Sequence, residues 1–249
     1  MTTIAKDKLI VALDVDRAAE ALQLFEALRD VVGTFKIGSQ LFTATGPDIV
    51  RQIVARGSRV FLDLKFHDIP NTVAAAGIEA TRLGVSIFNV HAAGGAEMMK
   101  RTSAAVTEIA DREGLARPKV IGVTLLTSLN KKSLEQIGFN DDPRSLVGRL
   151  ARSAAECDLD GVVASPQEIE FIRQTISIPS FLIVTPGIRS SKDALDDQKR
   201  TLTVAAAIGA GADYLVVGRP ILKAADPAVA ARDVVTEIDD ALRQSNQPI

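Results

Sequence analysis

Residues 59–68 have the sequence RVFLDLKFHD, in which the apolar run Val60–Leu62 leads directly into charged residues. Side chains alternate between the two faces of a strand, so Phe61, Asp63 and Lys65 are predicted to share one face. Burying a carboxylate beside an ammonium costs several kcal/mol per ion unless geometry and hydrogen bonds compensate. The pattern therefore predicts a polar site at the end of a β-strand.

The charges near Lys65 restrict its chemistry. Carboxylates nearby, at Asp63 and Asp68, favour the protonated form of a lysine, which suits a proton donor or an electrostatic anchor. A Schiff-base lysine must be neutral, so the same surroundings disfavour that nucleophilic role. We interpret Lys65 as a proton donor. The alternative is a solvent-exposed ion pair at a strand end, which contributes about 0–1 kcal/mol.

Length and composition exclude several classes of protein. The chain has 249 residues, enough for one (β/α)8 barrel domain spanning residues 1–249. Its 29 basic and 31 acidic residues give a net charge of −2, so we expect no nucleic-acid or membrane partner. The single cysteine, Cys157, excludes an intramolecular disulfide and fits a reducing compartment. Residues 1–8 lack the apolar core of a signal peptide, so we expect a soluble, cytoplasmic protein.

Short β-branched runs alternate with amphipathic stretches along the chain, as in repeated βα units. The predicted strands are Leu9–Asp14, Phe35–Gly38, Arg59–Lys65, Ile87–His91, Val120–Leu125, Gly161–Ala164, Phe181–Thr185 and Tyr214–Gly218. Helices are predicted at Ala18–Val31, Thr72–Leu83, Ala96–Arg112, Pro143–Glu156 and Thr201–Gly209. Eight parallel strands favour a closed (β/α)8 TIM barrel, because closure removes exposed edges; a doubly wound open sheet is the alternative.

Enzymes with this barrel place their sites at the carboxyl ends of the strands, and here those ends are rich in reactive residues. They comprise Asp14, Lys36, Asp63, Lys65, His91, Thr124, Thr127, Ser165, Pro186–Arg189 and Gly218–Arg219. Some have a simpler explanation, because Asp14 or Ser165 can cap a helix and Lys36 can lie in solvent. Their coincidence at one end of the predicted barrel favours a functional site.

The loops after the last two predicted strands have the chemistry of a phosphate site, which barrels often place there. Gly187 and Gly218 allow close approach of the backbone, while Arg189 and Arg219 supply forked donors and Gln198 an amide. Two histidines, His67 and His91, are too few to indicate zinc, so we expect no metal; His91 is interpreted as a hydrogen-bonded structural residue.

Together these motifs resemble those of the orotidine 5′-phosphate decarboxylase family, in its bacterial, monofunctional form, over essentially the whole chain. The matching features are Leu13-Asp14, Lys36, Asp63-x-Lys65-x-x-Asp68-Ile69-Pro70-Asn71-Thr72, Asn89-Val90-His91, Leu126-Thr127-Ser128, Thr185–Arg189, Asp197-Gln198 and Val217–Pro220. The resemblance implies cofactor-independent decarboxylation of orotidine 5′-phosphate to uridine 5′-phosphate, the last step of de novo UMP biosynthesis, with Lys65 as the proton donor to C6.

The resemblance also implies roles for individual residues. Lys36, Asp63, Lys65 and Asp68 would form a charged catalytic network in a homodimer, with Asp68 and Thr72 reaching the partner subunit's site. The remaining substrate-binding residues would be Asp14 and Lys36 at the ribose, Thr127 or Ser128 at the pyrimidine, Pro186 in the loop after the seventh strand, and Arg189, Gln198, Gly218 and Arg219 at the phosphate.

One alternative shares the same barrel and the Asp-x-Lys-x-x-Asp pattern. Magnesium-dependent sugar-phosphate decarboxylases or epimerases have an acidic metal ligand near the end of the second strand, where this chain has Lys36. A cation at that position would repel a divalent metal. A non-catalytic barrel that binds a phosphorylated ligand is the other alternative.

Overall fold

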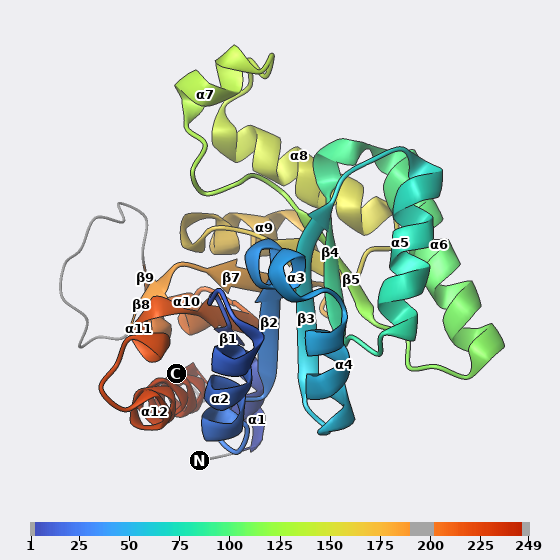
Figure 1. Ribbon diagram of the computed structural model, residues 1–249. Helices are drawn as coiled ribbons and strands as arrows, with labels where there is room; N and C mark the ends of the chain where they lie inside the picture. Colours follow the sequence, from blue (N-terminus) through green and yellow to red (C-terminus); the bar gives the residue numbers. More distant parts are fainter. Residues whose placement is uncertain (1–2, 190–201, 246–249) are drawn as a thin grey trace.

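The computed structural model describes residues 3–189 and 202–245, and its centre is a closed barrel of eight parallel strands (Figure 1). These are β1 (Leu9–Ala12), β2 (Thr34–Gly38), β3 (Arg59–Phe66), β4 (Ile87–His91), β5 (Lys119–Val123), β6 (Gly161–Val163), β7 (Leu182–Pro186) and β10 (Tyr214–Val217). Strand β1 pairs with both β2 and β10, which closes the ring. The predicted (β/α)8 barrel is confirmed, and the open-sheet alternative is wrong.

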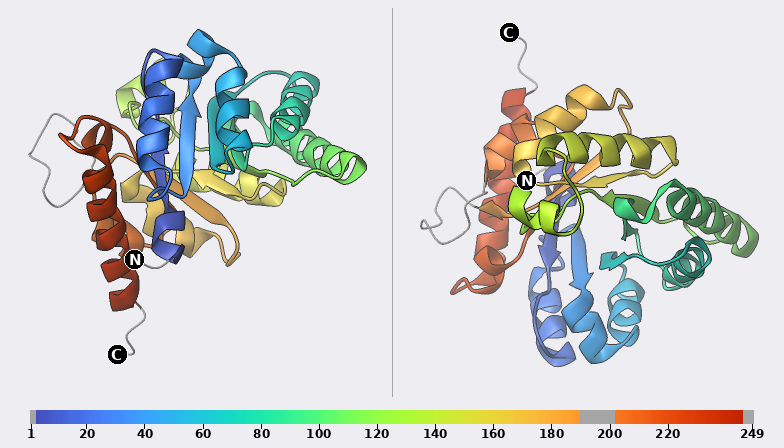
Figure 2. Two further views of the ribbon diagram at one scale, coloured as in Figure 1. Left: turned by 60° about the horizontal axis from the view of Figure 1, so that its bottom comes forward. Right: turned by 90° about the horizontal axis from the view of Figure 1, so that it is seen from above.

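Helices form an outer layer around the barrel (Figure 2). They are α1 (Thr3–Lys8), α2 (Ala18–Leu28), α3 (Ser39–Thr45), α4 (Asp48–Ala55), α5 (Pro70–Arg82), α6 (Ala96–Glu113), α7 (Lys131–Gln136), α8 (Pro143–Glu156), α9 (Ile169–Thr175), α10 (Val204–Gly209), α11 (Arg219–Leu222) and α12 (Pro227–Ser245), with 3-10 turns η1 (Ala92–Gly94) and η2 (Pro166–Glu168). None of these described helices is long and apolar enough to cross a membrane.

One predicted helix begins later than expected. Residues Leu202–Thr203 form strand β9, which pairs in parallel with β8 (Ile188–Arg189). Helix α10 starts only at Val204, where the Thr203 hydroxyl accepts a hydrogen bond from the Ala206 amide at 3.2 Å. The prediction of a helix from Thr201 was therefore wrong at Leu202 and Thr203, and Thr201 itself lies outside the described residues.

The apolar core has two layers. Inward-pointing side chains from the strands fill the barrel, whereas outward-pointing ones pack beneath the helices. The inner layer consists of Ile10, Ala12, Phe61, Ile87, Ile121, Val184 and Val216, with Val163 and Tyr214 against it. Such filling leaves no room for a ligand inside the barrel, so a site must lie outside it, and in this fold sites lie at the carboxyl ends of the strands.

Candidate active site

A cavity of about 650 Å³ lies at the carboxyl end of the barrel. Four of its lining residues, Ala12, Phe61, Val163 and Val216, also belong to or pack on the inner core layer, so they form an apolar floor. Its other lining residues are Asp14, Lys36, Asp63, Lys65, Val123, Leu125–Thr127, Ala164, Ser165, Pro186–Ile188, Gly218–Pro220 and Lys223. The cavity therefore combines an apolar floor with a charged rim.

Four charged side chains of alternating sign form a row along this rim. The Lys36 ammonium lies 3.0 Å from Asp14 Oδ1 and 3.3 Å from Asp63 Oδ2, and Asp63 Oδ1 lies 2.6 Å from Lys65 Nζ. The side chains of Lys36 and Asp63 are only 10% and 13% exposed, against 33% for Lys65. Lys36 does not lie in solvent, as one interpretation of the sequence allowed, but is held between two carboxylates.

The local conformation of β3 explains how Lys65 reaches the cavity. The pairing of β3 with β4 joins Leu62 to Phe88 and then Phe66 to Val90, so three residues of β3 stand opposite one residue of β4. Lys65 adopts φ +52°, which is rare for a residue with a side chain and costs about 1–3 kcal/mol. The strand is thus bulged at its end, and the bulge directs Lys65 to the cavity.

Asn89, the residue of β4 opposite the bulge, holds it in place. Its side chain is fully buried; Asn89 Oδ1 accepts a hydrogen bond from the Lys65 amide at 2.8 Å, and Asn89 Nδ2 donates to Asp63 Oδ1 at 2.7 Å. The amide group therefore satisfies a backbone donor left unpaired by the bulge and orients the carboxylate that contacts Lys65. The motif containing Asn89 was noticed in the sequence, but no role was predicted for this residue.

The two histidines lie together near the end of β4. Their ring centroids are 5.2 Å apart, with His91 half-buried and His67 exposed. Burial lowers the pKa of His91, and the neighbouring His67 and Lys65 lower it further, while Asp63 opposes them. Because its pKa is lowered, the His91 imidazole is uncharged at pH 7. Its contact with His67 is between the two rings.

The part of the cavity wall formed by the loops after β7 and β10 contains glycines and cationic side chains. Gly187 has φ +77°, a conformation that favours glycine, and Gly218 leads into helix α11. Arg219 begins that short helix and Lys223 directly follows it, four residues later, and both line the cavity. Lys223 was not predicted; its spacing from Arg219 was the available signal. The Arg189 side chain and Gln198 lie outside the described part of the chain.

Three other predicted site residues lie away from the cavity lining. Asp68 and Thr72 are exposed, and the Ile69 amide donates a hydrogen bond to Asp68 Oδ1 at 2.6 Å. Ser128 is exposed beside Thr127, and only Thr127 of the two is part of the described lining. One subunit therefore brings together Asp14, Lys36, Asp63 and Lys65 but leaves Asp68 and Thr72 on its surface.

Comparison with known proteins identifies the family of the chain. The model of the orotidine 5′-phosphate decarboxylase / HUMPS family matches residues 7–234. The chain belongs to this family. The resemblance inferred from the sequence motifs is confirmed.

Similar proteins from bacteria carry the decarboxylase name. An orotidine 5′-phosphate decarboxylase of Geobacter sulfurreducens is 53% identical over 236 residues, covering 94% of this chain and 97% of the relative. Another, of Syntrophotalea carbinolica, is 50% identical over 244 residues, covering 98% and 100%. The crystal structure of orotidine 5′-phosphate decarboxylase from Lactobacillus acidophilus has a TM-score of 0.82 and 34% identity, covering 93% of this chain and 98% of that one.

Proposed function

We propose that the chain catalyses decarboxylation of orotidine 5′-phosphate to uridine 5′-phosphate and CO2. The observation that carries this proposal is the row of alternating charges from Asp14 to Lys65 above the apolar floor of a cavity of about 650 Å³. The floor suits a flat pyrimidine ring, while the charged rim suits a reaction in which negative charge moves. The names of similar proteins support the same activity.

The reaction needs electrostatic help at one carbon atom. Loss of CO2 from C6 leaves an electron pair in an sp² orbital that cannot delocalise into the ring, so a fixed positive charge near C6 lowers the barrier. Lys65 supplies that charge and then its proton, which goes to C6. Asp63 places a carboxylate beside the substrate carboxylate, which raises the energy of the bound substrate relative to the transition state. The chain's own residues supply both the charge and the proton in this scheme.

The phosphate is assigned to the wall containing Gly218, Arg219 and Lys223, together with Gln198 and Arg189. A distant anion site lets the binding energy of the phosphate contribute to catalysis at the ring. We expect Arg219→Ala to raise KM about 10²-fold with a smaller change in kcat, since a charge-assisted contact is lost. Lys132→Ala, at an exposed residue on α7, is the charge-matched control. An unchanged KM in Arg219→Ala would count against this placement.

We further infer a homodimer in which Asp68 and Thr72 complete the partner subunit's site. Its support is the exposure of both side chains next to Ile69, an apolar residue that is 66% exposed. Mixing inactive Lys65→Ala and Asp68→Ala subunits should restore activity, because one site of each heterodimer then holds both residues. Absence of recovery, with subunit exchange confirmed by mass spectrometry, would contradict a shared site.

The metal-dependent sugar-phosphate reaction is the second candidate. The Lys36 ammonium lies within 3.3 Å of both Asp14 and Asp63, so it fills the position between two carboxylates that a divalent cation would need. The deciding experiment measures absorbance loss of orotidine 5′-phosphate in the presence of a chelator. Activity under those conditions supports the proposal, whereas activity only on a ketose phosphate with magnesium overturns it. A cytoplasmic location is proposed with this activity, since one buried cysteine suits a reducing compartment.

A further inference from the structure

Ser165 belongs to the cavity wall opposite the charged row. It follows β6 with extended backbone angles, φ −68° and ψ 157°, so its side chain continues the inward face of Val163. In the barrel order β6 lies three strands from β3, which carries Lys65, so the two residues face the cavity from different sides. Ser165 is only 2% exposed, and it lines the cavity.

The Ser165 hydroxyl has a hydrogen-bond donor that the protein does not use. Ser165 is the N-cap of η2, where its own amide donates to Glu168 Oε2 at 2.9 Å and the Glu168 amide donates to the Ser165 carbonyl at 3.0 Å. A capping hydroxyl acts only as an acceptor, so capping leaves its proton unused. In the described structure no acceptor lies within hydrogen-bond reach of the Ser165 hydroxyl proton, and in the capping box with Glu168 the hydroxyl can only accept.

Nearby backbone acceptors are already engaged. The Val163 carbonyl accepts hydrogen bonds from both the amide and the hydroxyl of Thr124, at 3.3 Å and 3.0 Å. The Val184 carbonyl accepts a hydrogen bond from the Ala164 amide at 3.1 Å, in line with the pairing of β6 with β7. An unpaired hydroxyl at a buried position is unfavourable, so a ligand that brings an acceptor to it gains affinity.

We propose that the Ser165 hydroxyl donates a hydrogen bond to a carbonyl oxygen of the pyrimidine ring and so contributes to recognition of the base. This inference rests on the proposed function. With C6 facing Lys65, the opposite ring edge, N3 flanked by the C2 and C4 carbonyls, faces the side of the cavity to which Ser165 belongs. The hydroxyl therefore contacts one of these two oxygens.

The test measures the affinities of uridine 5′-phosphate and its 2-thio and 4-thio analogues by calorimetry. We expect Ser165→Ala to weaken binding of uridine 5′-phosphate roughly 3- to 10-fold, the range of a neutral hydrogen bond. Sulfur is a poor acceptor, so the analogue with sulfur at the contacted position should show almost no further loss in the variant. The other analogue should lose as much as uridine 5′-phosphate, which identifies the oxygen.

Matched variants separate this contact from helix capping. Ser165→Thr keeps the hydroxyl and should bind as the unsubstituted protein does, whereas Ser165→Cys, with a weak donor, should resemble Ser165→Ala. Thr185→Val removes another buried hydroxyl that lacks a partner among the described residues. Thr185 lies outside the cavity lining, so this variant should leave all three affinities unchanged. Melting temperatures verify that every variant is folded.

Two results would overturn the inference. One is unchanged affinity of uridine 5′-phosphate in both Ser165→Ala and Ser165→Cys, and the other is an equal loss for all three ligands. Failure of the proposed function would differ from either, because the unsubstituted protein would then release no CO2 from orotidine 5′-phosphate.

Discussion

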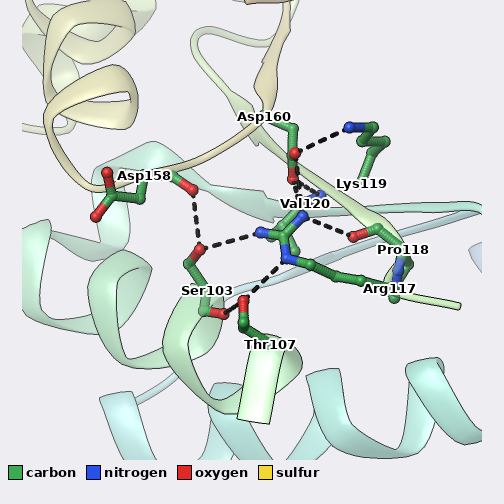
Figure 3. Close-up of polar contacts among 8 residues, drawn as sticks. All are labelled: Ser103, Thr107, Arg117, Pro118, Lys119, Val120, Asp158 and Asp160. Atoms are coloured by element: carbon green, nitrogen blue, oxygen red, sulfur yellow. Dashed lines mark hydrogen bonds and ion pairs between the residues drawn. The ribbon is translucent and has the colours of Figure 1, made fainter. Parts of the chain in front are cut away.

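Two charged networks lie at opposite ends of the barrel strands. The rim network, Asp14, Lys36, Asp63 and Lys65 with Asn89, faces the cavity at the carboxyl ends. The base network, Ser103, Thr107, Arg117, Lys119 and Asp160, lies where β5 and β6 begin (Figure 3). Both contain partly buried ion pairs, yet only the rim network lines the large cavity.

The Arg117–Asp160 part of the base network is closed on itself, whereas the Lys119 side chain is exposed and contacts Asp160 only at 3.4 Å. All three nitrogen atoms of the Arg117 guanidinium donate to the protein: Nη1 to Asp160 at 2.7 Å, Nε to Thr107 at 2.9 Å and Nη2 to Ser103 at 3.3 Å. Asp160 also accepts from the Val120 amide at 2.8 Å, which ties the start of β5 to that of β6. In the rim network, by contrast, Asp63 accounts for one of the three N–H donors of Lys65.

The comparison shows that the same residue types can have different roles in the two networks. At the base, the Arg117–Asp160 pair, whose donors and acceptors are used within the protein, fixes two strands, as expected of the amino end of such a barrel. At the rim, the bulged end of β3 presents to the cavity an ammonium whose N–H donors are only partly used by Asp63. Substitutions should therefore affect turnover at the rim and stability at the base.

The largest expected effect is that of Lys65→Ala. In the proposed mechanism this substitution removes both the proton donor and the positive charge at C6, so we expect kcat to fall about 10⁴-fold or more while uridine 5′-phosphate still binds. The measurements are CO2 release and calorimetric binding. Lys119→Ala, at the base, is the matched lysine control and should leave kcat unchanged. Substantial residual decarboxylation by Lys65→Ala would refute its role and erase the proposed difference between the networks.

Asn89→Ala tests whether the bulge must be held. Losing both hydrogen bonds should displace Lys65 and Asp63, and we expect kcat to fall about 10²-fold with little change in the affinity of uridine 5′-phosphate. Asn89→Asp should be at least as harmful, because it places a second carboxylate beside Asp63. A stability loss with unchanged kcat would show that Asn89 supports only the fold.

The bulge also marks the limit of what the sequence could predict. Alternation along β3 suggested that Asp63 and Lys65 share a face, but only the pairing with β4 produces the φ of +52° at Lys65. Lys65 and Asp63, the hydrogen-bond partners of Asn89, lie 24 and 26 residues away in the sequence, so no local sequence pattern predicts these contacts. Tertiary contacts of this kind do not follow from periodicity.

Elements fixed by local chemistry were predicted well. The bounds of helix Pro143–Glu156 are confirmed, because Asp142 caps it by accepting from the Arg144 and Ser145 amides and Pro143 suits the first turn. The start of α10 was missed because residues 202–203 pair with the distant strand Ile188–Arg189. The sequence around Lys36 does not predict its position between two carboxylates. Its partners, Asp14 and Asp63, lie at the ends of two other strands and are brought to it only by the fold.

A substitution at the base should act in the opposite way to those at the rim. Asp160→Ala removes the partner of Arg117 and an acceptor of the Val120 amide, so we expect the free energy of unfolding to fall by about 2–3 kcal/mol. Turnover by the folded fraction should be unchanged. Urea denaturation and steady-state kinetics give the two quantities, and Lys119→Ala, with an exposed pair at 3.4 Å, should cost less than about 0.5 kcal/mol. A fall in kcat without loss of stability would contradict the assignment.

The smallest effect concerns pH and His91. Its pKa is lowered in the folded protein, chiefly by burial, so below the ordinary value of 6.5 the unfolded chain binds the proton more readily than the folded one. The free energy of unfolding should therefore fall as the pH drops from 7.5 to 5.5. Because the side chain is only half-buried, the contribution should stay below about 1 kcal/mol.

Substitution isolates this contribution from that of other titrating groups. His91→Gln should lose less stability than the unsubstituted protein over the same pH interval, since His67, Asp63 and Lys65 are present in both and their effects largely cancel. Urea midpoints at the two pH values provide the measurement. An equal loss in both proteins would mean that the acid sensitivity arises from groups other than His91.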